Sequence, residues 1–157
     1  MIELGGYADE DITSSDALRT AILSEHERLR TLLSETAGRA AAMTGSAFDL
    51  DELRAWARSF YVALEEHLTF EARAFPPALR DVIGWGSVLQ AQIEETHARQ
   101  RETLARARLR PPEVLSAEEL AGNLRVLATD LLSDIEREDA ALLHADLDAI
   151  ATDGTGG

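Results

Sequence analysis

The chain has 157 residues, 45% of them apolar and 5% aromatic, with no cysteine and a formal net charge of −14. This length suits one domain with a sizeable core. The negative charge makes phosphate backbones and anionic membrane surfaces poor partners. The lack of cysteine excludes disulfides, thiolate catalysis and cysteine-ligated metal sites, so a metal site in this chain would use nitrogen and oxygen ligands.

The predicted elements begin after an acidic N-terminal segment, residues 1–13, which we expect to be flexible. Glycine and proline residues then divide the chain into segments that each begin with helix-capping residues. These caps are Ser14 or Ser15, Asp49 with Glu52, Ser87 with Gln90, and Ser116 with Glu119. In chain order, the predicted helices span residues 15–43, 50–75, 87–109 and 117–151, followed by a flexible tail over 152–157.

Short connectors favour antiparallel neighbours, so residues 14–151 are predicted to form one all-α domain, an up-down-up-down four-helix bundle. No apolar run is long enough to span a bilayer, and the first residues lack the basic and apolar regions of an export signal. We therefore expect a cytoplasmic protein without membrane or nucleic-acid partners.

Each predicted helix carries an apolar stripe, with residues spaced by three and four, that becomes polar partway along its length. The polar members of these stripes are His26, His67, Glu71, His97, Arg101, Asp134 and Glu138. Any one of them alone is most simply a satisfied core residue, or one that reaches water at the edge of its stripe. Their concurrence favours a shared site, because buried polar side chains are costly unless they bind a cation or one another.

The most specific motif is His67-Leu-Thr-Phe-Glu71 followed by Phe75-Pro76 on the second predicted helix. The other matching elements are Ser24-Glu-His26-Glu, His97, and Ile135-Glu-Arg-Glu138-Asp139. Together they resemble the hemerythrin-like, or HHE cation-binding, family over nearly the whole helical region. The resemblance implies two irons within the bundle, bridged by carboxylates of the second and fourth helices, in a site that binds dioxygen, senses oxygen or nitric oxide, or handles iron.

The same resemblance implies roles for individual residues. His26 and His67 would serve one metal, and His97 would serve the second. Glu71 would bridge the two metals together with either Glu138 or Asp139.

Two histidines of the family pattern are absent, and their positions hold Arg101 and Asp134. Arginine carries only hydrogen-bond donors and stays protonated, so Arg101 cannot ligate a metal. Since both positions would serve the same metal, we expect Arg101 and Asp134 to lie close together. The predicted result is a salt bridge that occupies part of the second metal's space.

Three interpretations follow for the candidate metal residues His26, His67, Glu71, His97, Asp134, Glu138 and Asp139. The first is a mononuclear or asymmetric site for iron or another divalent ion. The second is a complete dinuclear centre with Asp134 as a ligand and Arg101 beside it, which could activate dioxygen as an enzyme. The third is a vestigial site in a metal-free helical interaction module.

Of these, we predict a non-haem iron protein that binds one or two ions and has an oxygen- or redox-linked sensing, binding or storage role. Its expected partner is dioxygen or another small diatomic ligand. Reversible oxygen carriage is not expected, because the loss of two imidazoles should shift the redox behaviour of one metal position.

Overall fold

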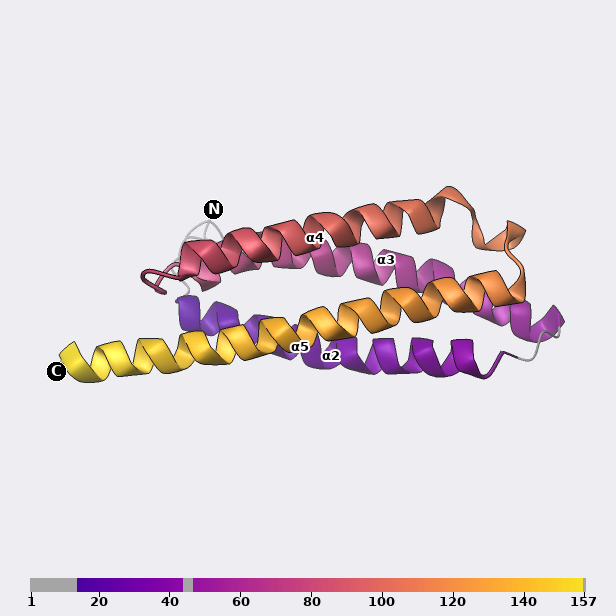
Figure 1. The fold of residues 1–157 in the computed structure, drawn as a ribbon. Coiled ribbons are helices and arrows are strands. Elements are labelled where there is room, and N and C mark those ends of the chain that lie inside the picture. Colours follow the sequence, from indigo (N-terminus) through magenta and orange to yellow (C-terminus); the bar gives the residue numbers. More distant parts are fainter. Residues whose placement is uncertain (1–13, 44–46, 157) are drawn as a thin grey trace, which may run out of the picture.

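The computed structural model describes residues 14–43 and 47–156, and this part of the chain is an all-α bundle without strands. Its elements are α2 (Ser15–Ala41), α3 (Ala47–Ala78), α4 (Gly86–Leu109), a short 3-10 helix η1 (Pro112–Val114) and α5 (Ala117–Gly156). Successive helices run in opposite directions, with α2 beside α3 and α5, and α4 closing the bundle against α3 and α5 (Figure 1). The predicted four-helix bundle is confirmed.

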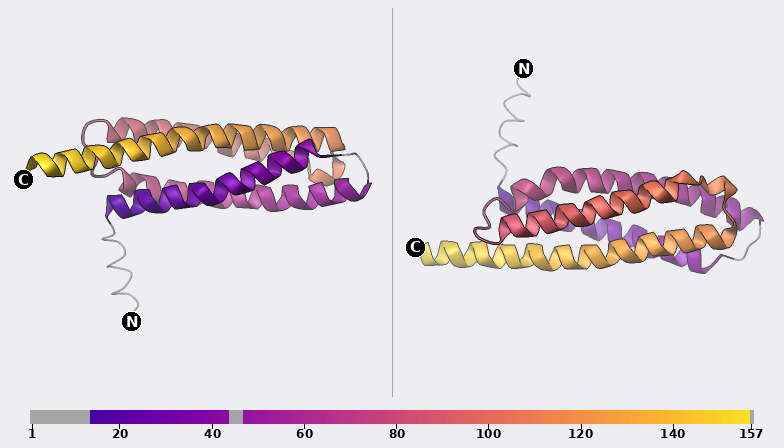
Figure 2. Two further views of the ribbon diagram at one scale, coloured as in Figure 1. Left: turned by 90° about the horizontal axis from the view of Figure 1, so that it is seen from below. Right: turned by 45° about the horizontal axis from the view of Figure 1, so that its top comes forward.

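The last turns of α5 run past the ends of the neighbouring helices (Figure 2). This helix continues to Gly156, beyond its predicted end at residue 151. It therefore includes residues 152–156 of the predicted tail. The predicted flexible segment 1–13, the Gly45-Ser46 connector and residue 157 lie outside the described residues. No described helix has a stretch long and apolar enough to cross a membrane.

Pro76 and Pro77 do not end α3 at residue 75 as predicted, because the helix includes both and continues to Ala78. A proline has a φ that fits a helix, although it lacks the N–H of its own position and its ring crowds the carbonyl four residues earlier. The backbone N–H of Leu79 still donates to the carbonyl of Phe75 at 3.1 Å. The break in the ladder is thus confined to the last turn.

The predicted caps are confirmed at Ser14, whose hydroxyl accepts from the Ala17 N–H at 3.1 Å, and at Ser116, which accepts from the Glu119 N–H at the same distance. The predictions of Asp49 and Ser87 are wrong, because α3 already begins at Ala47 and α4 at Gly86. The preceding Gly84 has a φ of 96°, a conformation that favours glycine, and it reverses the chain before Ser87 is reached.

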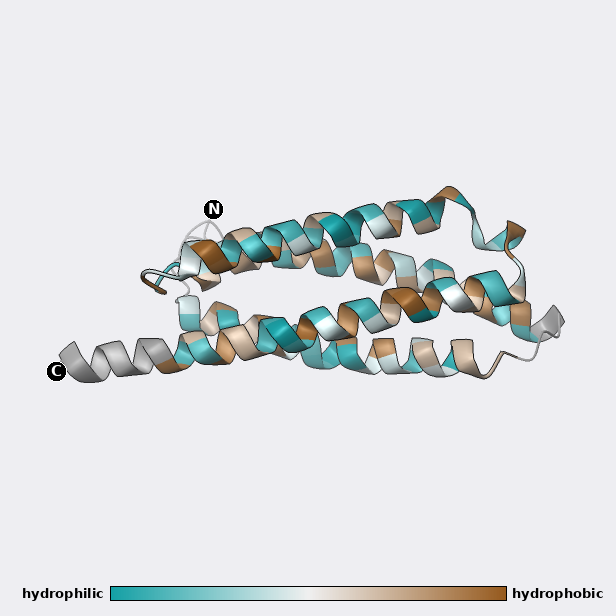
Figure 3. Cartoon of the chain, viewed as in Figure 1, coloured by the Kyte–Doolittle hydropathy of each residue, from teal (hydrophilic) through white to brown (hydrophobic). Residues whose placement is uncertain are grey.

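Two apolar clusters form the core, and a polar layer separates them. One cluster contains Phe60 and Leu124, and the other contains Ile22 and Phe75. On every helix the inward-facing row passes from one cluster to the other through a buried histidine or carboxylate. Figure 3 shows hydrophilic positions over much of the visible face of α4, whereas hydrophobic positions recur along α5. The polar residues found partway along the predicted stripes therefore make up this layer.

A buried arginine near the start of α2 joins three parts of the chain. The Arg19 side chain is 1% exposed, and its Nη1 donates to Asp81 at 2.6 Å and to the Ala78 carbonyl at 2.9 Å. Its Nε donates to Asp146 of α5 at 2.5 Å. Burial by itself would lower the pKa of Arg19, but the two carboxylates raise it above its ordinary value. The guanidinium therefore stays charged and ties α2 to α5 and to the connector after α3.

Candidate metal centre

All four helices contribute a side chain to the polar layer, and Glu71 of α3 lies at its centre. Its Oε2 lies 2.8 Å from Nε2 of His26 on α2. Its Oε1 lies 2.6 Å from Nε2 of His67 on its own helix and 3.3 Å from Nε2 of His97 on α4. Each of these four side chains is at most 3% exposed. One carboxylate thus contacts three imidazoles away from water.

Glu138 of α5 is the fifth residue of the cluster and contacts two of its imidazoles. Its Oε2 lies 2.9 Å from Nε2 of His97, and its Oε1 lies 3.3 Å from Nε2 of His26. The donor atoms form two groups, each lying within 4.8 Å: His26, His67 and Glu71, and then Glu71, His97 and Glu138. Ligand atoms that bind one ion at about 2.0–2.2 Å lie at similar distances from one another. The cluster therefore offers two adjacent candidate positions for a cation, and they share Glu71.

Besides Nδ1 of His67, three buried ligand atoms of this cluster have no hydrogen-bond partner among the described residues. They are Nε2 of His67, Oε1 of Glu71 and Oε1 of Glu138. The first two approach each other closely without hydrogen-bond geometry. An unsatisfied buried acceptor costs about 1–3 kcal/mol, whereas a cation would bind the lone pairs of all three atoms. The residues present therefore fit a metal ion with nitrogen and oxygen ligands.

Asp139 lies beside this cluster and orients His26. Its Oδ1 is 2.6 Å from Nδ1 of His26, and its other oxygen accepts from Arg30. With Nδ1 held in this way, Nε2 of His26 faces Glu71 and Glu138. A carboxylate that holds the outer nitrogen of an imidazole is the usual support of a metal-binding histidine. Of the two carboxylates left open by the sequence, Glu138 is thus in the cluster, and Asp139 positions an imidazole.

The predicted salt bridge between Arg101 and Asp134 is wrong. Arg101 is exposed, and its guanidinium donates to the Leu68 carbonyl at 3.3 Å. Asp134 is buried, but it accepts from Gln100 and Arg137 and lies outside both candidate groups.

Arg101 is rotated by about 40° from the inward direction of His97, because four residues advance a helix by about 400°. Its long side chain can then reach water. Gln100 and Arg137 lie off the predicted apolar stripes, so the spacing of apolar residues did not predict their contacts with Asp134. An acidic residue followed by arginine three positions later, as in Asp134 and Arg137, is the local signal for one of these contacts.

The cluster holds protons when no metal is bound. Burial by itself would lower the pKa of its imidazoles, but the neighbouring carboxylates of Glu138 and Glu71 raise the pKa of His26 to about 10 and that of His97 to about 9. Burial tends to raise the pKa of Glu71, yet the three imidazoles hold it well below its usual range. At Glu138 burial prevails and the pKa is raised. These shifts favour protonated His26 and His97 beside an ionised Glu71 when no metal is bound.

These protons predict opposite effects of pH on the metal-free and metal-loaded protein. The pKa values of His26 and His97 in the folded state, about 10 and about 9, exceed the unfolded value of about 6.5. The metal-free protein should therefore be most stabilised below about pH 6.5 and should lose that contribution as pH rises through 9–10. Since a cation must displace the same protons, its affinity should rise over this range.

Melting temperatures of chelator-treated and zinc-loaded protein at pH 6.5, 7.5 and 8.5 test this expectation, with zinc as a redox-inert ion. The gap between the two forms should widen with pH. A constant or narrowing gap would show that protons and metal do not compete for the cluster.

One comparison with known proteins indicates a cation-binding family. A family model described as the hemerythrin HHE cation binding domain matches residues 18–145. The matched range contains all five residues of the cluster. Neither the curated proteins nor the solved structures yielded a match.

Proposed function

Because the chain belongs to the hemerythrin HHE cation-binding family, we propose that it is a non-haem iron-binding protein with an oxygen- or redox-linked role. The observation that carries the proposal is the buried cluster of three imidazoles and two carboxylates, in which the same three ligand atoms lack a hydrogen-bond partner among the described residues. The residues that would hold iron are His26, His67, Glu71, His97 and Glu138. This set of nitrogen and oxygen ligands suits iron, manganese or zinc.

The arrangement favours two ions over one, with Glu71 as the shared ligand. One position would have His26 and His67 in addition, and the other would have His97 and Glu138. Asp134 does not support a fuller set of ligands, because Gln100 and Arg137 already occupy its oxygens. Iron bound here would supply one-electron redox chemistry and a binding position for dioxygen.

A role in sensing, binding or storage fits a site that holds its ions through few protein ligands. With three protein groups at each position, further coordination positions stay open to a small ligand. Oxygen activation by an enzyme is the second candidate. A surface hollow of about 260 Å³, lined by Ile93, Thr96 and Glu138, supports this candidate because it brings a molecule from solvent up to a cluster residue.

Elemental analysis of protein purified without chelating resin or added metal tests the proposal. About two irons per chain would support the dinuclear centre, and about one would support an asymmetric site. Since an ion that binds only the folded state stabilises it by mass action, a hundredfold excess over its dissociation constant should add about 2.7 kcal/mol. A chelator should remove this gain. Protein that stays metal-free after anaerobic iron loading, with unchanged stability, would support the vestigial interpretation and overturn the proposal.

A further inference from the structure

A cavity of about 330 Å³ lies between α3, α4 and α5 and shares no residue with the proposed iron ligands. Its volume is within the range of small-molecule sites. One side of the cavity is apolar and is formed by Leu64, Leu68, Leu104, Leu127 and Leu131. These side chains offer an apolar body a surface away from water.

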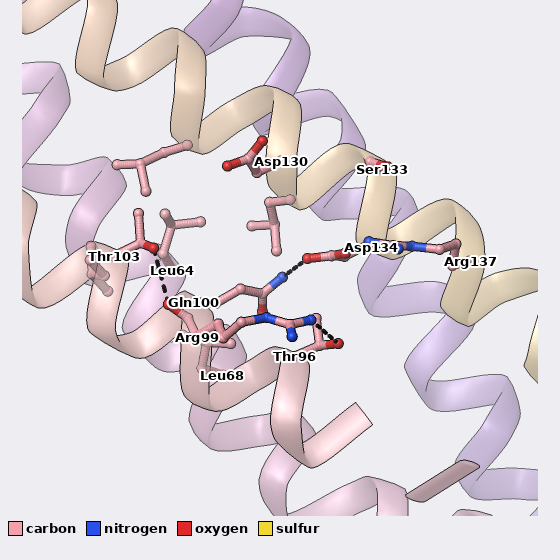
Figure 4. Close-up of a pocket in the computed structure, with 13 residues that line it drawn as sticks. Leu64, Leu68, Thr96, Arg99, Gln100, Thr103, Asp130, Ser133, Asp134 and Arg137 are labelled. Atoms are coloured by element: carbon pink, nitrogen blue, oxygen red, sulfur yellow. Dashed lines mark hydrogen bonds and ion pairs between the residues drawn. The ribbon is translucent and has the colours of Figure 1, made fainter. Parts of the chain in front are cut away.

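Two hydrogen-bond acceptors that line the cavity have no partner among the lining residues. Gln100 donates to Asp134, while its Oε1 is buried with no hydrogen-bond partner among the described residues. Asp130 makes no hydrogen bond or ion pair with the other lining residues (Figure 4). The two lining arginines already have carboxylate partners, Arg99 in Glu95 and Arg137 in Asp134. An occupant that satisfies these two acceptors, Oε1 of Gln100 and the carboxylate of Asp130, must bring donors.

We propose that this cavity binds a small organic amine with an apolar body. An ammonium group carries three donors and a positive charge, which complement Oε1 of Gln100 and the carboxylate of Asp130. The leucine side chains would pack against the carbon skeleton. The net charge of −14 adds a long-range attraction for a cation and disfavours an organic acid of the same shape.

The cavity also adjoins the metal centre. It shares Thr96, Asp134 and Arg137 with the hollow that is lined by Glu138. Asp134 and Glu138 lie on successive turns of α5, so the near end of the cavity lies about one helical turn from the cluster. Since no proposed iron ligand lines the cavity, the amine should also bind to metal-free protein.

Three probes of similar size and different charge test this inference: 2-phenylethylamine, 2-phenylethanol and 3-phenylpropionate. Titration calorimetry and ligand-observed NMR on the full chain, with and without chelator, should rank the amine first and the acid last. Asp130→Asn should weaken binding of the amine about fivefold, as expected for the loss of one partly exposed ion pair, and should leave the alcohol unaffected. Asp51→Asn makes the same chemical change at an exposed position outside the cavity and should change neither affinity.

A second variant, Thr103→Phe, places a ring at the wall of the cavity and should remove binding of both the amine and the alcohol. Circular dichroism checks that each variant is folded. If Thr103→Phe does not fold, the binding measurements on Asp130→Asn test the proposal. Failure of the amine to bind, equal binding of amine and acid, or unchanged amine binding in Asp130→Asn would overturn the proposal. None of these outcomes depends on the iron content.

Discussion

Replacing Glu71 with glutamine is expected to abolish stable metal binding at both candidate positions. Glu71 belongs to both groups of donors and contacts all three imidazoles. An amide is a neutral, weaker ligand, and its NH2 group would direct protons at the imidazole nitrogens. Each position would then keep only two strong ligands. Iron content should fall to near zero, and the chelator-sensitive part of the melting temperature should disappear.

Glu66→Gln is the matched control for this variant, because Glu66 is an exposed glutamate on the same helix. Its iron content should equal that of the unmodified chain. Circular dichroism checks that both variants keep their helices. Full iron content in Glu71→Gln would contradict the assignment of Glu71 as the shared ligand and leave a site built from other residues.

Replacing Arg19 with leucine is expected to give the largest loss of stability outside the metal centre. The substitution would leave Asp81 and Asp146 without their shared cation and the Ala78 carbonyl without its donor. Breaking a buried ion pair by removing one partner costs about 3–5 kcal/mol, and we expect about 3 here because both aspartates keep contact with water. For a chain of this size the melting temperature should fall by about 6–12 °C.

Urea denaturation of the metal-free protein measures this loss as a lower midpoint with an unchanged slope. Arg58→Leu is the control, because Arg58 is 53% exposed and pairs with Glu113 at the surface. Exposed pairs contribute about 0–1 kcal/mol, so this variant should lose little. Equal losses for the two variants would mean that the network around Arg19 does not hold the helices together.

Most of the fold could be predicted because its signals are local. Glycine, proline and capping residues mark the ends of the helices, and the spacing of apolar residues marks the inward face of each one. The exceptions have local causes that only the backbone reveals. The turn at Gly84 starts α4 before Ser87, and the helical φ of Pro76 and Pro77 lets α3 continue to Ala78.

Site residues could be predicted where one residue lies in the middle of an inward face. They could not be predicted where either of two residues could face inward. His26, His67, Glu71 and His97 lie in the middle of their inward faces, and all four meet in the cluster. Arg101 lies on the stripe of α4 between His97 and the buried Leu104, but its long side chain reaches the surface.

The sequence by itself determined the four helices and the polar layer across them, since both depend on spacing along one chain. Only the tertiary structure decided that Glu138 faces the cluster while Asp139 supports His26, and that Arg19 joins Asp81 to Asp146. Neighbouring residues on a helix point about 100° apart, so a rotation set by the packing of other helices decides which of them turns inward. Contacts between residues more than a hundred positions apart depend on that packing and leave no periodic trace in the sequence.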